Sequence, residues 1–345
     1  MLLTLQQHNR FPSLQHTKSF TFLGEGAWHN AYLAETNDGP FVVRIPKKVA
    51  YDKEITFNET ALLAEYRGTA LYYEKANLIR PNICPEQFYY YVSPDLTYTV
   101  ESFAGRTLSL DQETEASMQQ YGYELGQFYY EMDQVPANEP GIGYFTWKNG
   151  KMIGEITEDA NSFFQEETTE YKADITELYQ AGFSVDLSYL FPLIDERIFS
   201  NITLTNQDNS LENLLLSNKQ LRIIDPYPIL YTGESLAANF IHNYRFTFPY
   251  YFNTERYKKH NFHTQIKKLR AMADGFCDGY TTVNKNLQFA LDIECTLKMT
   301  NMIYNHYKAL QQPLTREQEI RMGTHRQIED RLQLLLSDLQ QMKIR

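Results

Sequence analysis

The most constraining feature of this sequence is the segment from Asn206 to Pro228, in which polar residues bracket two short apolar runs. The runs, at residues 214–216 and 221–224, are separated by the turn-like sequence Ser-Asn-Lys-Gln, so the segment predicts a β-hairpin. A hairpin brings its two ends together, and here the ends are Asn213 and Asp225. An amide oxygen and a carboxylate placed side by side are hard ligands, which Mg²⁺ accepts when it also holds substrate phosphates.

A second carboxylate, Asp208, precedes Asn213 by five residues, so one short loop can hold it near the same place. The order Asp-x4-Asn, followed by an apolar strand that ends in Asp, is typical of the catalytic loop and the metal-binding aspartate of kinases. Asp and Asn are also common in ordinary turns, so a surface hairpin with polar ends is the alternative. The kinase interpretation therefore depends on what lies upstream.

The N-terminal region has the pattern of an antiparallel sheet. Three strand-like runs follow one another, with the turn sequence Asn-Asp-Gly-Pro before the third, at residues 20–22, 31–35 and 41–45. Gly24 and Gly26 lie at the first corner, where glycines let the backbone approach a phosphate, although such a pair also occurs in ordinary turns. Arg44 lies on the third run, where kinases carry the cation that meets the α- and β-phosphates.

A helix is predicted to follow these strands. Its start lies within residues 57–65, and Glu59 is fifteen residues beyond Arg44. We expect Glu59 to pair with Arg44 and to place its guanidinium.

Taken in order, these segments and the stretch Glu-Ser-Phe-Ala-Gly-Arg-Thr-Leu at residues 101–108 resemble the aminoglycoside phosphotransferase family, the small-molecule branch of the protein-kinase-like fold. The resemblance covers roughly residues 20–240. It implies an α+β, bilobed protein-kinase-like fold, with a small N-terminal lobe of antiparallel sheet plus helix and a large, mainly helical C-terminal lobe. The nucleotide-binding lobe would span residues 1–102 and the catalytic and substrate-binding lobe 103–345, with a hinge at about 101–108.

The resemblance also implies roles for individual residues. Asp208 would accept the proton of the acceptor hydroxyl or orient it, while Asn213 and Asp225 would hold Mg²⁺. ATP or GTP would be the co-substrate, with backbone groups of the hinge facing the base. The implied nucleotide-binding residues are Gly24, Gly26, Arg44, Glu59, Glu101 and Phe103.

Three positions depart from the family's pattern. Asn206 stands where the family usually has His, and residues 226–228 read Pro-Tyr-Pro after the metal-binding aspartate. Arg44 stands where the family usually has Lys; the two are not interchangeable, so Lys47 and Lys48 are alternative phosphate contacts. The alternative function is therefore a catalytically impaired pseudokinase that acts as a nucleotide- or ligand-binding module. A protein-substrate kinase is disfavoured, because no Asp-Phe-Gly to Ala-Pro-Glu segment follows Asp225.

Composition limits the partners and the compartment. The net charge of −11 disfavours nucleic acid and anionic membranes, and it suits a cationic substrate such as an aminosugar. The 3 cysteines are widely spaced, which fits a reducing cytoplasm, and no apolar run is long enough for a membrane span. We expect a cytoplasmic monomer or homodimer that phosphorylates a small-molecule hydroxyl, with the acceptor and the choice of ATP or GTP left open.

The second half of the chain is predicted to be mostly helical. Residues 121–130 have helical spacing, and residues 141–150 read as a hairpin insertion. A closing helix is predicted from one apolar face, formed by Ile328, Leu332, Leu335, Leu339 and Met342.

Overall fold

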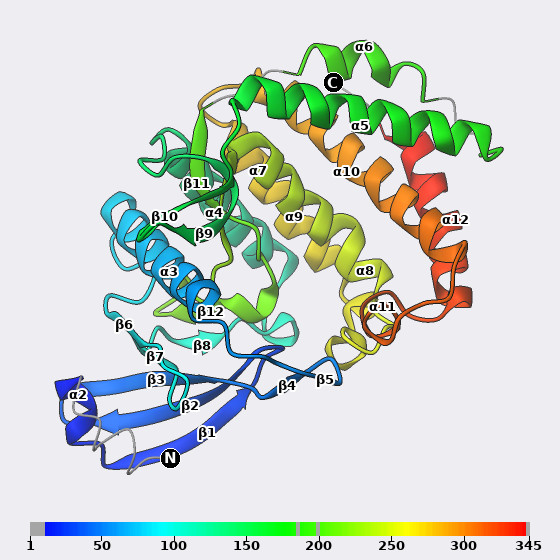
Figure 1. Cartoon of the computed structure of the whole chain (residues 1–345). Helices are drawn as coiled ribbons and strands as arrows, with labels where there is room; N and C mark the ends of the chain where they lie inside the picture. The colour runs from blue at the N-terminus through cyan, green and yellow to red at the C-terminus, as the bar shows by residue number, and fades with distance from the viewer. Residues whose placement is uncertain (1–10, 184–186, 198–200, 343–345) are drawn as a thin grey trace. The chain divides into compact units, whose positions relative to one another are not determined.

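A computed structural model describes residues 11–183, 187–197 and 201–342 (Figure 1). The chain divides into two compact units. The first unit comprises the chain up to Leu108 together with residues 145–153 and 208–228, and the second comprises residues 109–144, 154–207 and the chain from 229 onward. The lobes proposed from the sequence, at 1–102 and 103–345, stay a prediction.

The first unit is built on a five-stranded antiparallel sheet with the order β1-β2-β3-β7-β6. Its strands are β1 (Ser19–Glu25), β2 (His29–Thr36), β3 (Gly39–Pro46), β6 (Phe88–Tyr91) and β7 (Tyr98–Ser102). Side chains that alternate along the strands bury one face, and the core there includes Ala34, Val43 and Val100. The three predicted N-terminal strands are therefore confirmed.

Helix α3 (Glu59–Ile79) follows two short paired strands, β4 (Val49–Ala50) and β5 (Lys53–Glu54). Asn58 caps the helix, because its side chain accepts the N–H of Ala61 at 3.1 Å. Tyr66, Thr69 and Tyr73 are spaced by three and four residues and are all buried, which defines the covered face of α3. A further short helix, α2 (Pro12–Gln15), precedes β1.

The β-hairpin predicted within residues 206–228 is also confirmed. Strand β12 (Leu214–Ser217) pairs with β13 (Gln220–Ile223), and β8 (Arg106–Thr107) adds to its other edge. Asn218 and Lys219 join the strands with φ of 52° and 64°, as a two-residue type I′ turn requires. Gly105 has a φ of 132°, and a Cβ there would lie 2.5 Å from the carbonyl oxygen of Leu216, so this position of the predicted hinge requires glycine.

The second unit is mainly helical (Figure 1). Its helices are α4 (Glu115–Asp133), α5 (Ala160–Gln180), α6 (Leu190–Asp195), α7 (Gly233–His242), α8 (Phe248–Tyr250), α9 (Ile266–Thr281), α10 (Leu287–Leu310), α11 (Arg316–Met322) and α12 (His325–Gln341). A further sheet of order β10-β9-β14-β11 contains β9 (Ile142–Lys148), β10 (Lys151–Ile156), β11 (Ile202–Asn206) and β14 (Pro228–Thr232). Its residues 145–153 and Pro228 are assigned to the first unit. The hairpin predicted at 141–150 and the closing helix are both present. In Figure 1, α12 lies beside α10, and the two share one apolar core.

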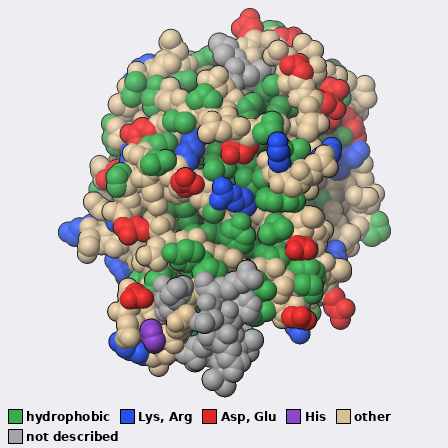
Figure 2. Space-filling view, turned by 60° about the vertical axis from the view of Figure 1, so that its left-hand side comes forward, with side chains coloured by type: hydrophobic (Ala, Val, Ile, Leu, Met, Phe, Trp, Pro, Cys, Tyr) green, Lys and Arg blue, Asp and Glu red, His purple; other side chains and the backbone are tan. Residues whose placement is uncertain are grey.

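An antiparallel N-terminal sheet and a helix-rich remainder match the predicted α+β fold class. Among the described residues, no helix is both long enough and apolar enough to cross a membrane. On the face shown in Figure 2, basic side chains are dispersed among acidic, apolar and other side chains rather than gathered into one broad patch.

Candidate active site

The metal-ligand pair predicted from the hairpin is assembled in the first unit. Helix η2 (Leu211–Asn213) leads directly into β12, and Asn213 is buried at its end. The Asn213 side-chain Nδ2 donates to the carbonyl oxygen of Asp225 at 3.2 Å, and the Asn213 carbonyl accepts the N–H of Ile224 at 3.0 Å. These hydrogen bonds join the two ends of the hairpin, so Asn213 and Asp225 lie side by side, as the predicted hairpin requires.

Asp225 has a left-handed backbone with a φ of 48° and a side chain that is 49% exposed. Non-glycine residues rarely adopt this conformation, which costs on the order of 1–3 kcal/mol and persists only where the surroundings hold it. Its conformation leaves the carboxylate accessible at the end of β13.

Arg44 is the cation of this site. Its Nη2 lies 2.9 Å from Oε1 of Glu101, and its Nη1 lies 3.4 Å from Oδ2 of Asp225. Burial by itself lowers the pKa of Arg44, but the carboxylates of Asp225 and Glu101 outweigh it and hold that pKa above its ordinary value. Arg44 is therefore a fixed positive charge next to the candidate metal ligand.

The expected pairing of Arg44 with Glu59 is wrong. Glu59 is the first residue of α3 and is exposed, whereas the ion pairs of Arg44 are made with Glu101 and Asp225. The reason is the register of the sheet. Val42 pairs with Glu101, so Glu101 and Arg44 share one face of neighbouring strands.

The remaining predicted residues lie in the same unit. Asp208 is half-buried and accepts the N–H of Ser210 at 3.0 Å, five residues before Asn213. Gly26 lies at the corner between β1 and β2, where its N–H donates to the carbonyl of His29 at 2.8 Å. A Cβ at Gly24 would meet nothing within 4 Å, so the space above this corner is open.

Glu101 and Phe103, which the sequence predicts to bind the nucleotide, make other contacts in the structure. The Glu101 side chain is only 2% exposed and is used by Arg44, while the N–H of Phe103 donates to the carbonyl of Pro40 at 3.1 Å. Contacts of either residue with a base stay a prediction. Lys47, the alternative cation, contacts Glu25 at 3.2 Å and the carbonyl of Gly26 at 3.4 Å.

Residues that the sequence analysis missed complete the surroundings of Asp225. The Tyr73 hydroxyl accepts the N–H of Asp225 at 3.0 Å, and Nε2 of His29 lies 2.9 Å from the Tyr66 hydroxyl. Burial lowers the pKa of His29, Asp225 opposes that effect and Arg44 adds to it. The spacing of seven between Tyr66 and Tyr73 places both on one face of α3, which is the signal that was available in the sequence.

The donor set suits a metal of the Mg²⁺ type. No group of three or more His, Cys, Asp or Glu side chains within the described part of the chain forms a complete metal cage. Mg²⁺ is commonly held by one or two protein oxygen ligands, with water and substrate phosphates supplying the rest. With its Nδ2 engaged by Asp225, Asn213 retains its Oδ1 as an acceptor, so this residue and the accessible carboxylate of Asp225 match that pattern.

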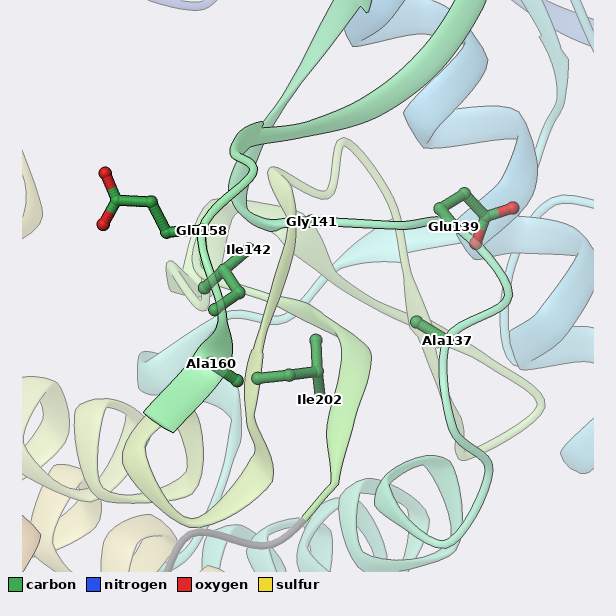
Figure 3. Close-up of a pocket in the computed structure, with 7 residues that line it drawn as sticks. All are labelled: Ala137, Glu139, Gly141, Ile142, Glu158, Ala160 and Ile202. Atoms are coloured by element: carbon green, nitrogen blue, oxygen red, sulfur yellow. The ribbon is translucent and has the colours of Figure 1, made fainter. Parts of the chain in front are cut away.

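A separate shallow pocket of about 240 Å³ lies in the second unit (Figure 3). Ile142, Ala160 and Ile202 give it an apolar lining. The carboxylates of Glu139 and Glu158 point away from it in opposite directions, so neither carboxylate is directed at a ligand there (Figure 3).

The fold is shared with small-molecule kinases of known structure. The chain superposes on aminoglycoside phosphotransferase APH(4)-Ia with a TM-score of 0.57 at 12% identity, covering 97% of this chain and 98% of that one. A thermostable mutant of the same enzyme, in ternary complex with AMP-PNP and hygromycin B, gives a TM-score of 0.55 at 12% identity over 98% of both chains. A choline/ethanolamine kinase family protein from Mesorhizobium loti gives 0.52 at 12% identity, covering 99% of this chain and 100% of that one.

These likenesses confirm the predicted resemblance at the level of the fold: the chain has the protein-kinase-like fold of aminoglycoside phosphotransferases. No protein-family model matches the sequence, and no curated protein matches it either.

Proposed function

We propose that this protein is a phosphotransferase that moves the γ-phosphate of ATP or GTP to a hydroxyl of a small molecule. The observation that carries the proposal is the joining of Asn213, Asp225 and Arg44 in one place, two oxygen ligands beside a fixed cation. Phosphoryl transfer asks a protein mainly for positioning and for neutralisation of phosphate charge, and this set supplies both.

Each residue then has a role. Asn213 and Asp225 hold Mg²⁺, which neutralises charge on the nucleotide phosphates, while Arg44 contacts the α- and β-phosphates. The corner containing Gly24 and Gly26 covers the phosphates. Asp208 accepts the proton of the acceptor hydroxyl or orients that hydroxyl for attack.

The acceptor is a small molecule in this proposal, with a cationic aminosugar as one candidate. The related fold of APH(4)-Ia, one form of which is captured with hygromycin B, and the net charge of −11 support this class. A cytoplasmic location follows from the cysteine pattern, and the protein acts as a monomer or homodimer.

The alternative is a pseudokinase that binds nucleotide without transfer. One observation favours it: Arg44 already contacts the carboxylate of Asp225, the same carboxylate that metal binding requires.

A screen for nucleotide consumption separates these functions. Purified protein is incubated with Mg²⁺ and ATP or GTP, alone and with a library of small hydroxyl compounds. A kinase consumes nucleotide with at least one acceptor, and Asp208→Asn lowers that rate by about a hundredfold or more, in line with loss of a general base. Mg²⁺-dependent nucleotide binding without turnover in any condition indicates the pseudokinase.

A further inference from the structure

Four residues of the first unit close a ring of polar contacts around the proposed phosphate site. Arg44 donates from Nε and Nη2 to Oε1 of Glu101, at 3.0 Å and 2.9 Å. The Tyr73 hydroxyl donates to Oε2 of the same carboxylate at 3.0 Å and accepts the N–H of Asp225 at 3.0 Å. Arg44 Nη1, 3.4 Å from Oδ2 of Asp225, completes the ring.

Two members of this ring are almost fully buried. Glu101 is 2% exposed and Tyr73 is 3% exposed. A buried carboxylate is costly unless it is paired and hydrogen-bonded, and here Arg44 and Tyr73 occupy both of its oxygens. The Tyr73 hydroxyl is also well placed to stay protonated, since burial and then the charge of Glu101 raise its pKa well above the ordinary value.

The carboxylate that pairs with Arg44 comes from a different element than in protein kinases. In protein kinases, the cation on the third strand pairs with a glutamate on the following helix, and the position of that helix controls the pair. Here the partner of Arg44 is on β7, the neighbouring strand of the same sheet. The guanidinium is therefore held by the sheet, and α3 contributes an uncharged hydroxyl, that of Tyr73, in place of a carboxylate.

That hydroxyl acts on the backbone of Asp225. The N–H of Asp225 is held by Tyr73 and its carbonyl oxygen by Asn213, so both of its backbone polar groups are fixed. These two contacts stabilise a residue that the chain holds at a φ of 48°.

We propose that Tyr73 and Glu101 are positioning residues for phosphoryl transfer. Tyr73 keeps Asp225 in its left-handed conformation, and Glu101 holds Nε and Nη2 of Arg44, so that Arg44 meets Asp225 through Nη1 and its charge is shared between the two carboxylates. This inference rests on the proposed function of the same site.

The first test removes only the Tyr73 hydroxyl. Tyr73→Phe leaves the N–H of Asp225 without its partner, so amide hydrogen exchange in the peptide containing residues 221–226 becomes faster. In calorimetry with Mg²⁺ and AMP-PNP, affinity falls by about tenfold, as expected for a partly buried donor left unsatisfied. The control is Tyr32→Phe in the same unit. The aromatic side chain of Tyr32 stacks on Phe20 and takes no part in the four-residue set of polar contacts, so this substitution changes neither the amide exchange nor the AMP-PNP affinity.

The second test neutralises Glu101 without changing its shape. In Glu101→Gln, Asp225 is the remaining carboxylate partner of Arg44, so the Mg²⁺ concentration that gives half-maximal AMP-PNP binding rises by about tenfold. Adding Arg44→Gln removes the competing cation and lowers this midpoint again, although nucleotide affinity stays weak. A purely structural role for Glu101 does not predict that reversal.

Unchanged amide exchange in Tyr73→Phe overturns the contact with Asp225. Faster exchange with unchanged affinity overturns the positioning role of Tyr73, and an unchanged Mg²⁺ midpoint in Glu101→Gln overturns that of Glu101. A wild-type protein that binds no AMP-PNP contradicts the proposed function and the positioning roles together. The exchange experiment needs no nucleotide, so it still decides whether Tyr73 holds the backbone of Asp225.

Discussion

Arg44 connects the two carboxylates of this site, because it contacts both Glu101 and Asp225. Removing one partner of a largely buried ion pair leaves the other charge uncompensated, which costs about 3 kcal/mol. We therefore expect Glu101→Ala to lower the free energy of unfolding by about that amount. A double-mutant cycle of Arg44→Ala and Glu101→Ala, followed by urea denaturation, measures the coupling between the two side chains.

The matched control is the same cycle with Glu59→Ala. Glu59 is exposed and is not an ion-pair partner of Arg44, so its coupling to Arg44 should be close to zero. A coupling as large for Glu59 as for Glu101 would contradict the observed pairing.

The difference between Glu59 and Glu101 shows which part of the site the local sequence pattern does not predict, namely the ion-pair partner of Arg44. The place of Arg44 on a strand predicts its part in the site, and the structure puts it beside Asp225. The place of Glu59 at the start of the following helix predicts it as the partner of Arg44. The true partner is 57 residues away and depends on the register between β3 and β7. Strand register between distant segments is a tertiary property that local pattern does not fix.

At the scale of elements, helices α4 and α9 of the second unit approach unusually closely. A Cβ on Gly122 would lie 2.1 Å from the carbonyl oxygen of Met272, and a Cβ on Gly126 would lie 2.1 Å from that of Phe276. We expect Gly122→Ala to destabilise the protein by about 2 kcal/mol through overpacking, despite the better helix propensity of Ala. Chemical denaturation measures the change.

Gln120→Ala provides the control for this helix. Gln120 is on α4 and exposed, so the substitution should change stability by no more than about 0.5 kcal/mol. Equal stability of Gly122→Ala and Gln120→Ala would mean that α4 and α9 have room to separate.

Hairpins and helices that are specified by nearby residues, through turn sequences or apolar spacing, are predictable from the sequence. The β12–β13 hairpin and the β9–β10 hairpin both close with residues at positive φ, and their turn sequences, Asn-Lys and Asn-Gly, lie between recognisable apolar runs. The closing helix α12 was visible from its apolar spacing, and four of its predicted face residues are buried, namely Ile328, Leu332, Leu335 and Leu339. The glycine spacing that sets the α4–α9 contact was present in the sequence, but its meaning depends on a partner helix more than 140 residues away.

At the scale of the whole molecule, buried histidines make stability depend on pH. Burial and then the charge of Lys298 lower the pKa of His242 to about 3, and burial and then Arg331 lower that of His306 to about 4. His306 Nδ1 donates to the carbonyl of Met302 at 2.7 Å, and its Nε2 accepts from Arg331 at 3.1 Å, so a second ring proton would face the guanidinium of Arg331. The neutral form is the one that fits the fold.

Protonation of these two histidines destabilises the folded protein as pH falls. Both folded pKa values lie below the unfolded value of 6.5, so their stabilising contribution is present above about pH 6.5 and is lost as pH falls toward 4. At pH 5 each histidine should cost about 2 kcal/mol of stability. Urea denaturation at pH 7 and pH 5 measures the loss, and His306→Gln should reduce it by about 2 kcal/mol. An unchanged pH dependence in His306→Gln would show that His306 is protonated in the folded protein.

Calorimetric titration of AMP-PNP with Mg²⁺ and with EDTA tests most directly our proposal that Asp225 and Asn213 hold a metal ion that binds nucleotide phosphates. We predict binding to the wild-type protein that requires Mg²⁺, and loss of that Mg²⁺-dependent binding in Asp225→Ala while circular dichroism shows an intact fold. Mg²⁺-dependent affinity that is equal in Asp225→Ala and in the wild-type protein, or a wild-type protein that binds no nucleotide, would contradict it.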